Sequence, residues 1–475
     1  MSFIFYDIVF LIFFVIFVSW FLYLRKENLK RDGLLFLYRT SWGIKLINKI
    51  GNRYKKTLNV LSYISIVTGY ILMVSMFYFL GRIVYLYITF PEIVREIKIP
   101  PITPLIPYLP QVFKLDFLPP FYFTYWIVII AIIAITHEFA HGIFAAYDKI
   151  KIKSTGFGFF PFFLPIFLAA FVELDEEKMA KKKISSQLAV LSAGTFANIL
   201  TAIFFFLVLL GFFYLAFAPS GVVYDTYPYS FAGISSITVV NGVNVANPTY
   251  EKISSLIADE GLNKVKVKNA DYVITKKSLD EQKDNSEILL YYDAPAINYD
   301  IGSVILSING VKITSIESVE KELSKYSPGE KITLKTLDEN KSAYDLEIVL
   351  GEHPEKNNQS WLGIGFTSQK TSGLFGKIYT LVSSFKKPHV YYESRAGDIN
   401  LFIYNLLWWL ILISISVALV NMLPVGIFDG GRFFYLTVLF ITRNKKIAKN
   451  LFAFSTYLIL FLIFVLMLFW AFSFV

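Results

Sequence analysis

Two histidines and a glutamate form the clearest chemical pattern of the chain: His137, Glu138 and His141. In a helix, residues four apart project from the same face, so the two imidazoles can hold one metal ion. Glu138 is rotated by about 100° from His137, which lets its carboxylate reach a water beside the metal without binding the metal. The chain has only four histidines, and two of them fall in this pattern. The pattern predicts a hydrolytic zinc site, which still needs one further protein ligand and a water.

Asp429 and Glu173 are the two candidates for the third protein ligand. Asp429 stands at the foot of a later apolar segment, where we expect it at the same membrane depth as the histidines. Taken alone, Asp429-Gly430 is typical of a turn at the end of a helix. Glu173 follows the second histidine, as the third ligand does in one class of soluble metalloprotease. Three further acidic residues stand within four positions of Glu173, which is typical of a solvated acidic patch. We favour Asp429 and keep Glu173 as the alternative.

The composition indicates an integral membrane protein. Hydrophobic residues make up 55% of the 475 positions, and phenylalanine alone supplies 47, which is more than a soluble chain of this length carries. The formal net charge of +9 gathers in loops between apolar runs. This distribution orients membrane proteins and is not a nucleic-acid footprint, so we expect no nucleic-acid partner. The absence of cysteine excludes disulfides and thiolate metal ligands.

Six apolar runs predict a polytopic α-helical membrane protein. The basic segment 25–57 after the first run predicts a cytoplasmic loop, because basic loops stay inside. Both termini are then exterior, and His137 and His141 lie in the cytoplasmic half of the third span of a cell-membrane protein. Glycine and proline interrupt residues 156–165, which predicts a re-entrant hairpin. The proline-rich segment 91–120 predicts an extended exterior connection. The expected spans are residues 3–24, 58–90, 121–147, 187–218, 401–423 and 451–474.

A polar insert with an internal repeat separates the fourth and fifth spans. The runs 239–245 and 306–313 resemble one another, and their Asn-Gly turns stand at 241 and 309. Each turn follows a strand pattern and precedes a helical one, which predicts two tandem α/β units outside the membrane. The expected divisions of the chain are 1–120 (first spans and loops), 121–218 (first part of the membrane core), 219–285 and 286–397 (the two units), and 398–475 (second part of the core).

The two units resemble PDZ domains, and the second resembles them better. Its segments Asp293–Ala296, Gly302–Gly310 and Leu362–Phe366 stand in the expected order. A PDZ-like unit implies an extended peptide ligand, which adds to the edge of a sheet. A rigid spacer or a steric gate without a peptide ligand is the alternative.

Three features together resemble the site-2 protease family of intramembrane zinc metalloproteases, over about residues 121–440. They are the His-Glu-x-x-His run, the motif Asn421-x-x-Pro424-x-x-x-x-Asp429-Gly430, and the insert between them. The resemblance implies one Zn²⁺ per chain, bound by His137, His141 and Asp429, with Glu138 as general base. It also implies that the substrates are single-span membrane proteins within the lipid bilayer.

Two asparagines take roles from the same resemblance. Asn198 would steady the oxyanion or hold the substrate, and Asn421 would help to unwind or position the substrate helix. An interhelical hydrogen bond is an equally open reading of Asn198. The chain departs from the family where Thr195 and Gly426 replace prolines and where Ala169–Val172 replaces a Gly-Gly-Tyr run. Neither Thr195 nor Gly426 touches a catalytic atom, whereas the change at Ala169–Val172 bears on how the hairpin holds substrate.

Two other functions fit parts of the sequence. One is a membrane scaffold that contains a structural metal and binds peptides through its PDZ-like units. The other is a zinc or metabolite transporter with a path of histidine and aspartate. A transporter requires polar residues along a whole pathway, and here they gather at one depth.

Overall fold

The computed structural model describes most of the chain in two compact units. One unit comprises residues 1–213 and 401–475, and the other comprises residues 214–400. The described residues are 3–32, 35–92, 94, 100–101, 105–113, 115, 118–159, 168–268, 270–338, 341–367, 380 and 382–472.

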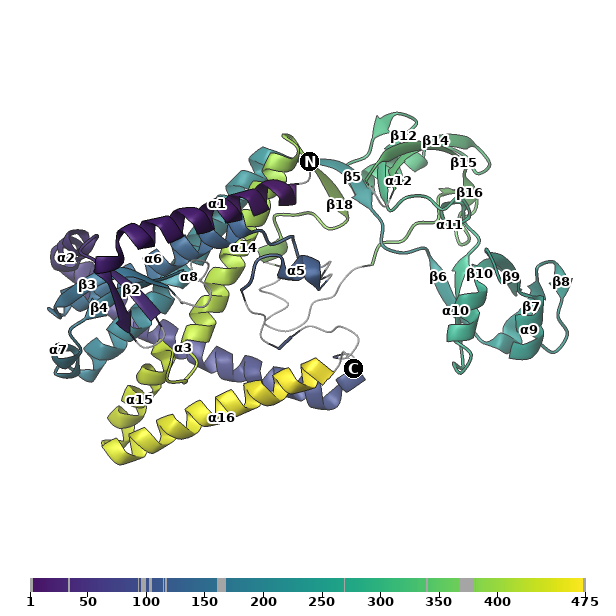
Figure 1. Ribbon diagram of the computed structural model, residues 1–475. Coiled ribbons are helices and arrows are strands. Elements are labelled where there is room, and N and C mark those ends of the chain that lie inside the picture. Colours follow the sequence, from purple (N-terminus) through teal and green to yellow (C-terminus); the bar gives the residue numbers. More distant parts are fainter. Residues whose placement is uncertain are drawn as a thin grey trace. The chain divides into compact units, whose positions relative to one another are not determined.

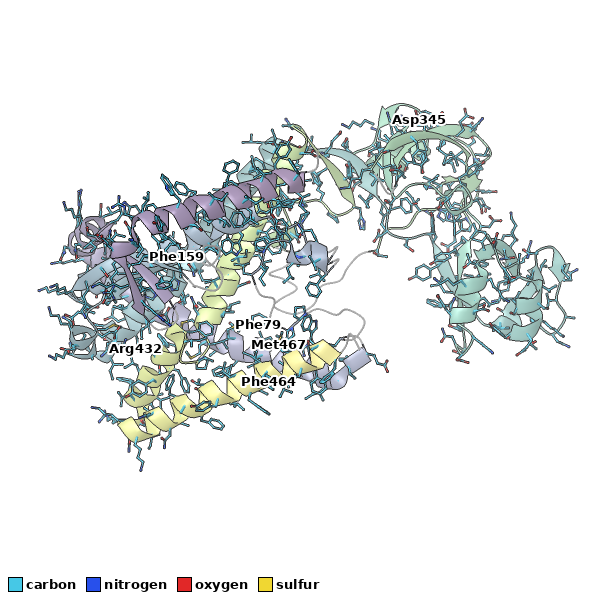
Figure 2. The ribbon with its side chains drawn as sticks, viewed as in Figure 1. Phe79, Phe159, Asp345, Arg432, Phe464 and Met467 are labelled. Atoms are coloured by element: carbon cyan, nitrogen blue, oxygen red, sulfur yellow. The ribbon has the colours of Figure 1, made fainter. Side chains whose placement is uncertain are left out.

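Six helices in the described part of the chain are long and apolar enough to cross a membrane (Figure 1). Their surfaces carry mostly apolar side chains, such as Phe79 on α3 and Phe464 on α16 (Figure 2). This confirms the predicted class of a polytopic membrane protein. The helices are α1 (Phe3–Leu24), α3 (Lys55–Thr89), α6 (Phe123–Tyr147), α8 (Ile184–Ala216), α14 (Asp398–Asn421) and α16 (Lys445–Phe472).

The basic segment after α1 folds into regular structure instead of a bare loop. A short 3-10 helix η1 (Lys26–Asn28) leads into β1 (Leu29–Asp32), β2 (Leu35–Thr40) and α2 (Ile44–Arg53). The helix α2 packs against α6, where Ile47 is fully buried. Gly51 allows close approach, because a Cβ there would stand 2.7 Å from the Cβ of Ala146. In the connection between α3 and α6, α5 (Leu109–Val112) is a single helical turn.

A four-stranded antiparallel sheet lies against the side of α6. Its order is β1-β2-β3-β4, with β3 at Ile152–Phe159 and β4 at Leu168–Leu174. The tip of the predicted re-entrant hairpin, residues 160–167, lies outside the described residues. The edge strand β4 contacts α6, and α7 (Glu176–Ala180) follows it.

The insert contains two mixed α/β layers with six-stranded sheets. The first sheet has the order β6-β11-β10-β9-β7-β8, and the second has the order β15-β14-β12-β5-β18 with β13 beside β12. Both Asn-Gly pairs form hairpin turns with positive φ, at 49° and 82° for Asn241-Gly242 and at 46° and 78° for Asn309-Gly310, as tight hairpins require. The strands of the first sheet are β6 (Tyr229–Ala232), β7 (Ile237–Val240), β8 (Val243–Asn244), β9 (Asn263–Val267), β10 (Ala270–Ile274) and β11 (Ile288–Tyr292).

The second sheet follows the alternating pattern of its sequence. In β14, Ile332 and Leu334 face the core, while the alternating positions Lys331, Thr333 and Lys335 are exposed. Its strands are β5 (Phe217–Val223), β12 (Val304–Ile308), β13 (Val311–Lys312), β14 (Lys331–Leu337), β15 (Ala343–Val349) and β18 (Val390–Ser394), with β16 (Gly351–Glu352) and β17 (Ser360–Trp361) paired separately. The connecting helices of the insert are η3 (Ile234–Ser236), α9 (Tyr250–Leu256), α10 (Lys276–Glu281), α11 (Pro295–Asn298) and α12 (Ile316–Leu323).

Along the chain, the segment that forms the first sheet is nested between two strands of the second sheet, β5 and β12. β5 follows α8 directly, yet it lies between β12 and β18 of the second sheet. The segment that forms the first sheet leaves after β5 and returns before β12. Its two ends meet where the amide N–H of Tyr292 donates to the carbonyl of Pro228 at 3.0 Å. The second sheet therefore needs residues from both ends of the insert.

This nesting predicts how fragments of the insert fold. A fragment of residues 286–397 lacks β5 and its buried Val222, so we expect it to remain unfolded. Residues 214–400, with 229–292 replaced by a short Gly-Ser linker, keep every strand of the second sheet and should fold. Far-UV circular dichroism and amide NMR dispersion of the two fragments provide the comparison. A well-dispersed spectrum from residues 286–397 alone would contradict the nested arrangement.

Candidate metal centre

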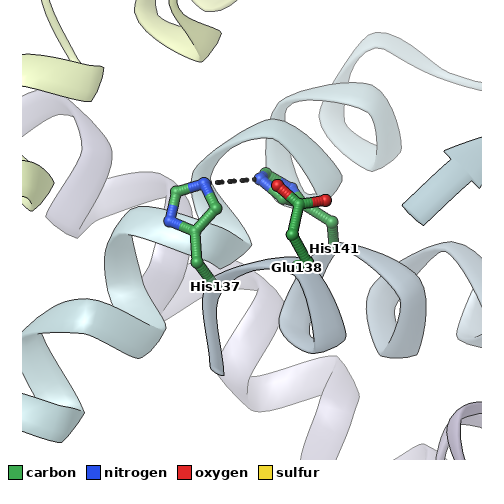
Figure 3. Close-up of side chains that lie close together, drawn as sticks. All are labelled: His137, Glu138 and His141. Atoms are coloured by element: carbon green, nitrogen blue, oxygen red, sulfur yellow. Dashed lines mark hydrogen bonds between the residues drawn. The ribbon is translucent and has the colours of Figure 1, made fainter. Parts of the chain in front are cut away.

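The helix α6 presents His137 and His141 on one buried face. Their side chains are one turn apart, and the residues are 7% and 8% exposed. The two Nε2 atoms are 3.0 Å apart, and the Glu138 carboxylate lies beside them (Figure 3). Among the described residues, these three offer ligand atoms within 4.8 Å of one another. The sequence spacing therefore places the two imidazoles as predicted.

Asp429 reaches the same point from the opposite end of the chain. It is the first residue of α15 (Asp429–Thr442), after the turn that ends α14. Its Oδ2 lies 3.3 Å from Nε2 of His137 and 3.2 Å from Nε2 of His141. The two glycines that follow allow this approach. A Cβ on Gly430 would stand 2.3 Å from the backbone carbon of Met422, and one on Gly431 would stand 2.3 Å from the carbonyl oxygen of Val425.

These three donor atoms match the ligand set of a tetrahedral zinc ion. Their separations are 3.0, 3.2 and 3.3 Å. Zinc holds nitrogen and oxygen ligands at about 2.0–2.1 Å, so two ligands of a tetrahedral ion stand roughly 3.3 Å apart. Histidine nitrogens and carboxylate oxygens are also ligands that zinc prefers. The residues present therefore fit a zinc ion.

Gly194 on α8 leaves open the space in front of the imidazoles. A Cβ at this position would stand 2.4 Å from Nε2 of His141 and 2.5 Å from Nε2 of His137. The point is nearly equidistant from the two ring nitrogens, and any side chain there would occupy it. Gly194 thus borders the metal centre itself.

Backbone and amide groups of α8 contact the far sides of both rings. Nδ1 of His141 lies 2.7 Å from the carbonyl oxygen of Val190. A carbonyl oxygen can only accept a hydrogen bond, so Nδ1 carries the proton. The lone pair of Nε2 then points toward Nε2 of His137 and Oδ2 of Asp429. Such outer contacts fix the tautomer and orientation of metal-binding histidines.

Asn198 contacts Nδ1 of His137, as the Val190 carbonyl contacts Nδ1 of His141. It is fully buried, and its Nδ2 lies 3.0 Å from Nδ1 of His137. Its Oδ1 has no hydrogen-bond partner among the described residues. Rotating the amide by 180° lets Oδ1 accept a hydrogen bond from Nδ1–H, which leaves the lone pair of His137 Nε2 free for a metal. Asn198 therefore contacts the side of His137 that faces away from the shared point of the donor atoms.

Glu138 points toward the sheet beside α6. Its Oε2 accepts a hydrogen bond of 2.9 Å from the backbone N–H of Val172 on β4. A cavity of about 30 Å³ adjoins it, lined in part by Phe139 and Thr155. A cavity of this size has room for a water molecule, so the carboxylate has both a fixed orientation and space for water.

The other two candidate residues lie away from the histidines. Glu173 on β4 accepts a hydrogen bond from the Ser154 hydroxyl at 2.6 Å and pairs with Arg39 at 3.5 Å. Asn421, the last residue of α14, lines a cavity of about 530 Å³ whose lining is mostly apolar and does not include the two histidines. Neither side chain has a hydrogen bond to His137 or His141 in the described part of the chain.

Sequence reasoning missed two contributors to this centre. The Val190 carbonyl and the Val172 amide are backbone groups, and no residue type signals their use. Gly194 carried a partial signal, because a small residue in an apolar helix indicates a close approach without naming the partner.

The position of Gly194 generates a direct prediction. Gly194→Ala places a methyl group against both Nε2 atoms, so we expect zinc affinity to fall by at least about 100-fold, beyond the usual loss from altering an outer contact. Gly211→Ala in the same helix is the matched control, since a Cβ there meets no atom within 4 Å. Measuring the zinc bound per purified chain during titration with a chelator compares the zinc affinities of the two variants. Equal zinc retention by both variants would show that Gly194 does not border the ion.

Comparison with known proteins places the chain in a family. A model of peptidase family M50 matches residues 125–466, which includes α6, α8 and the Asp429 segment. The chain is 34% identical over 179 residues to the uncharacterized protein MJ0971 of Methanocaldococcus jannaschii, covering 36% of this chain and 42% of that protein. It is 25% identical over 166 residues to the zinc metalloprotease RasP of Shouchella clausii, covering 30% of this chain and 40% of that protein.

These relatives match only in part, because the chain spans about two fifths of the length of each. The family match is broader and covers well over half of the chain. The six apolar helices agree with it and identify a multi-pass membrane protein. The chain therefore belongs to peptidase family M50.

Proposed function

We propose that the protein is an intramembrane zinc metalloprotease that cleaves single-span membrane proteins within or near their transmembrane segments. The observation that carries this proposal is the convergence of His137, His141 and Asp429, whose ligand atoms lie within 3.3 Å of one another. The two histidines belong to α6, a helix apolar enough to span a membrane, and Asp429 begins α15. Polar groups at such a place are costly and usually functional. The matched zinc metalloprotease RasP supports the same reading.

In this proposal one zinc ion per chain is held by the two Nε2 atoms and by the Asp429 carboxylate. Bound there, zinc supplies Lewis acidity, which makes a water nucleophilic near neutral pH and polarises a carbonyl. We prefer Asp429 to Glu173 as the third ligand because the Glu173 carboxylate already contacts Ser154 and Arg39.

Glu138 is the proposed general base and general acid. Its carboxylate stands next to the histidines and borders the cavity of about 30 Å³. From there it takes a proton from the attacking water and later delivers that proton to the leaving amide nitrogen. The hydrogen bond from Val172 holds the carboxylate in one orientation, so little reorganisation accompanies the transfer.

The edge strand β4 offers a place for the substrate backbone. The N–H of Val172 points away from β3, because it donates to Glu138, and Ala170 shares this orientation two residues earlier. A peptide bond in a membrane helix is shielded by helical hydrogen bonds and must be unwound before attack. An unwound segment laid along β4 would regain backbone hydrogen bonds next to Glu138.

The two asparagines receive different proposed roles. Asn198 orients His137 through Nδ1, which supports a positioning role in place of direct contact with an oxyanion. Asn421 lines the apolar cavity of about 530 Å³ between α3, α14 and α16. An apolar substrate helix suits such a cavity, and Asn421 would then offer a hydrogen bond where that helix begins to unwind.

We also propose an orientation and a role for the insert. Both termini and the insert face the exterior, and the metal centre lies toward the cytoplasmic side. The basic segments 25–57 and 443–449 support this orientation. The two α/β units are PDZ-like and bind extended peptides at a sheet edge or restrict access of substrates to the membrane. The Asn-Gly hairpins in both sheets support that resemblance.

Replacing Glu138 tests the proposed reaction. Glu138→Gln removes the proton acceptor and keeps the shape of the side chain, so we expect zinc retention with cleavage slowed by roughly 10²- to 10⁴-fold. Mass spectrometry of membranes that carry the wild type or the variant would look for released fragments of single-span proteins.

Glu177→Gln is the control, because Glu177 is exposed and lies outside the centre. Chelation should silence the wild type, and added zinc should restore it. Identical fragments from the wild type and Glu138→Gln would rule out the protease and favour the scaffold, to which this carboxylate is indifferent.

A further inference from the structure

An aspartate in the first membrane helix hydrogen-bonds to the start of the helix that carries the metal-binding histidines. Asp7 is the only charged residue of α1, and it is 1% exposed. A buried charge in an apolar helix is costly unless partners compensate it. None of the ion pairs among the described residues includes Asp7, so hydrogen bonds must compensate it.

Four hydrogen bonds reach the Asp7 carboxylate, two at each oxygen. Oδ2 accepts from the backbone N–H of Phe123 at 2.7 Å and from the Tyr108 hydroxyl at 2.6 Å. Oδ1 accepts from the backbone N–H and the hydroxyl of Thr124, at 2.9 and 2.5 Å. Burial and the hydrogen bond to Asp7 raise the pKa of Tyr108, which keeps its hydroxyl protonated as a donor.

These bonds supply a cap that α6 lacks in its own sequence. Its N-cap residue, Tyr122, provides no side-chain hydrogen bond. The first N–H groups of a helix have no partner inside the helix, and an apolar environment offers them no water. Asp7 binds the N–H groups of the first two residues, and its negative charge also suits the positive end of the helix dipole.

The same N-terminal segment holds the other end of α6. Ile47 of α2 lies against Gly142, where a Cβ would stand 3.0 Å from Cδ1 of Ile47. Gly51 approaches the backbone of α6, since a Cβ there would stand 2.8 Å from the carbonyl oxygen of Ile143. Figure 1 shows α1 and α2 at α6, which agrees with the contacts between these helices.

We propose that residues 3–32 and 35–53 form a brace that fixes the axial position of α6, with Asp7 as its positioning residue. The segment lies outside residues 125–466, which match the family. His137 follows Phe123 by 14 residues, or about 21 Å along a helix. A shift of α6 at its capped end would therefore move both imidazoles relative to Asp429 and Gly194, which belong to other helices.

Hydrogen exchange at the start of α6 tests the brace without reference to activity. In the full chain in detergent, we expect Asp7→Leu to speed exchange of the amides of Phe123 and Thr124 by roughly tenfold or more, as the loss of a helix cap does. Asp7→Asn keeps one oxygen acceptor and should be intermediate. Tyr108→Phe removes one donor to the carboxylate and should change exchange in the same direction by less. Glu27→Gln, an exposed acid of the same segment, should match the wild type.

Zinc retention and kinetics show whether the cap acts on the metal centre. We expect Asp7→Leu to release zinc to a chelator roughly tenfold faster, Asp7→Asn to rescue part of this loss, and kcat to fall with KM nearly unchanged. Only the kinetic measurement rests on the proposed function. If the wild type cleaves no substrate, the proposed function is overturned, and hydrogen exchange and zinc release still test the brace. Exchange at Phe123 and Thr124 equal to the wild type in Asp7→Asn and Asp7→Leu would overturn the brace. If Asp7→Leu fails to accumulate, the Asp7→Asn and Tyr108→Phe exchange rates decide.

Discussion

The structure depends on bringing three candidate metal-ligand atoms from three turns of helix to one point inside an apolar bundle. Each of these polar groups is costly to bury alone. Together they share one small space, where Nε2 of His137, Nε2 of His141 and Oδ2 of Asp429 lie 3.0 to 3.3 Å apart. Three lone-pair atoms turned toward one another repel unless a proton or a metal cation lies between them. In our proposal a zinc ion is that cation, which would make the metal part of the folded core.

Glycine makes this convergence possible in two places. Gly194 lets α8 approach Nε2 of both imidazoles, and Gly430 with Gly431 lets the first turn of α15 pack against residues 422–426, the turn that follows α14. Helices in membranes gain little from hydrophobic burial against one another, so close packing of small residues carries much of their association. Here the same small residues set the distances at the metal centre. Packing and chemistry are thus determined by the same positions.

Sequence reasoning recovered the parts of this design that are local. Apolar runs located the membrane helices, and the four-residue spacing of His137 and His141 placed both rings on one face. The predicted topology then placed Asp429 at the same membrane depth as the two histidines. Contacts between distant segments were not readable in this way. Nothing in the order of the strands reveals that β5 belongs to the later sheet, since pairing depends on tertiary packing. The sequence did not predict β1, β2 and α2, because the many basic residues of the segment 25–57 are typical of a loop. Asp7 is an acid in an apolar helix, and the sequence does not reveal its partners because they lie more than 100 positions away.

X-ray absorption at the zinc edge of the purified full chain tests the central claim most directly, because it counts the ligands around the metal. We predict nitrogen and oxygen ligands at about 2.0–2.1 Å, with outer scattering from two imidazoles. Asp429→Asn should alter this spectrum, and Glu173→Gln should leave it unchanged. A spectrum without two imidazoles, or one altered by Glu173→Gln and not by Asp429→Asn, would contradict it.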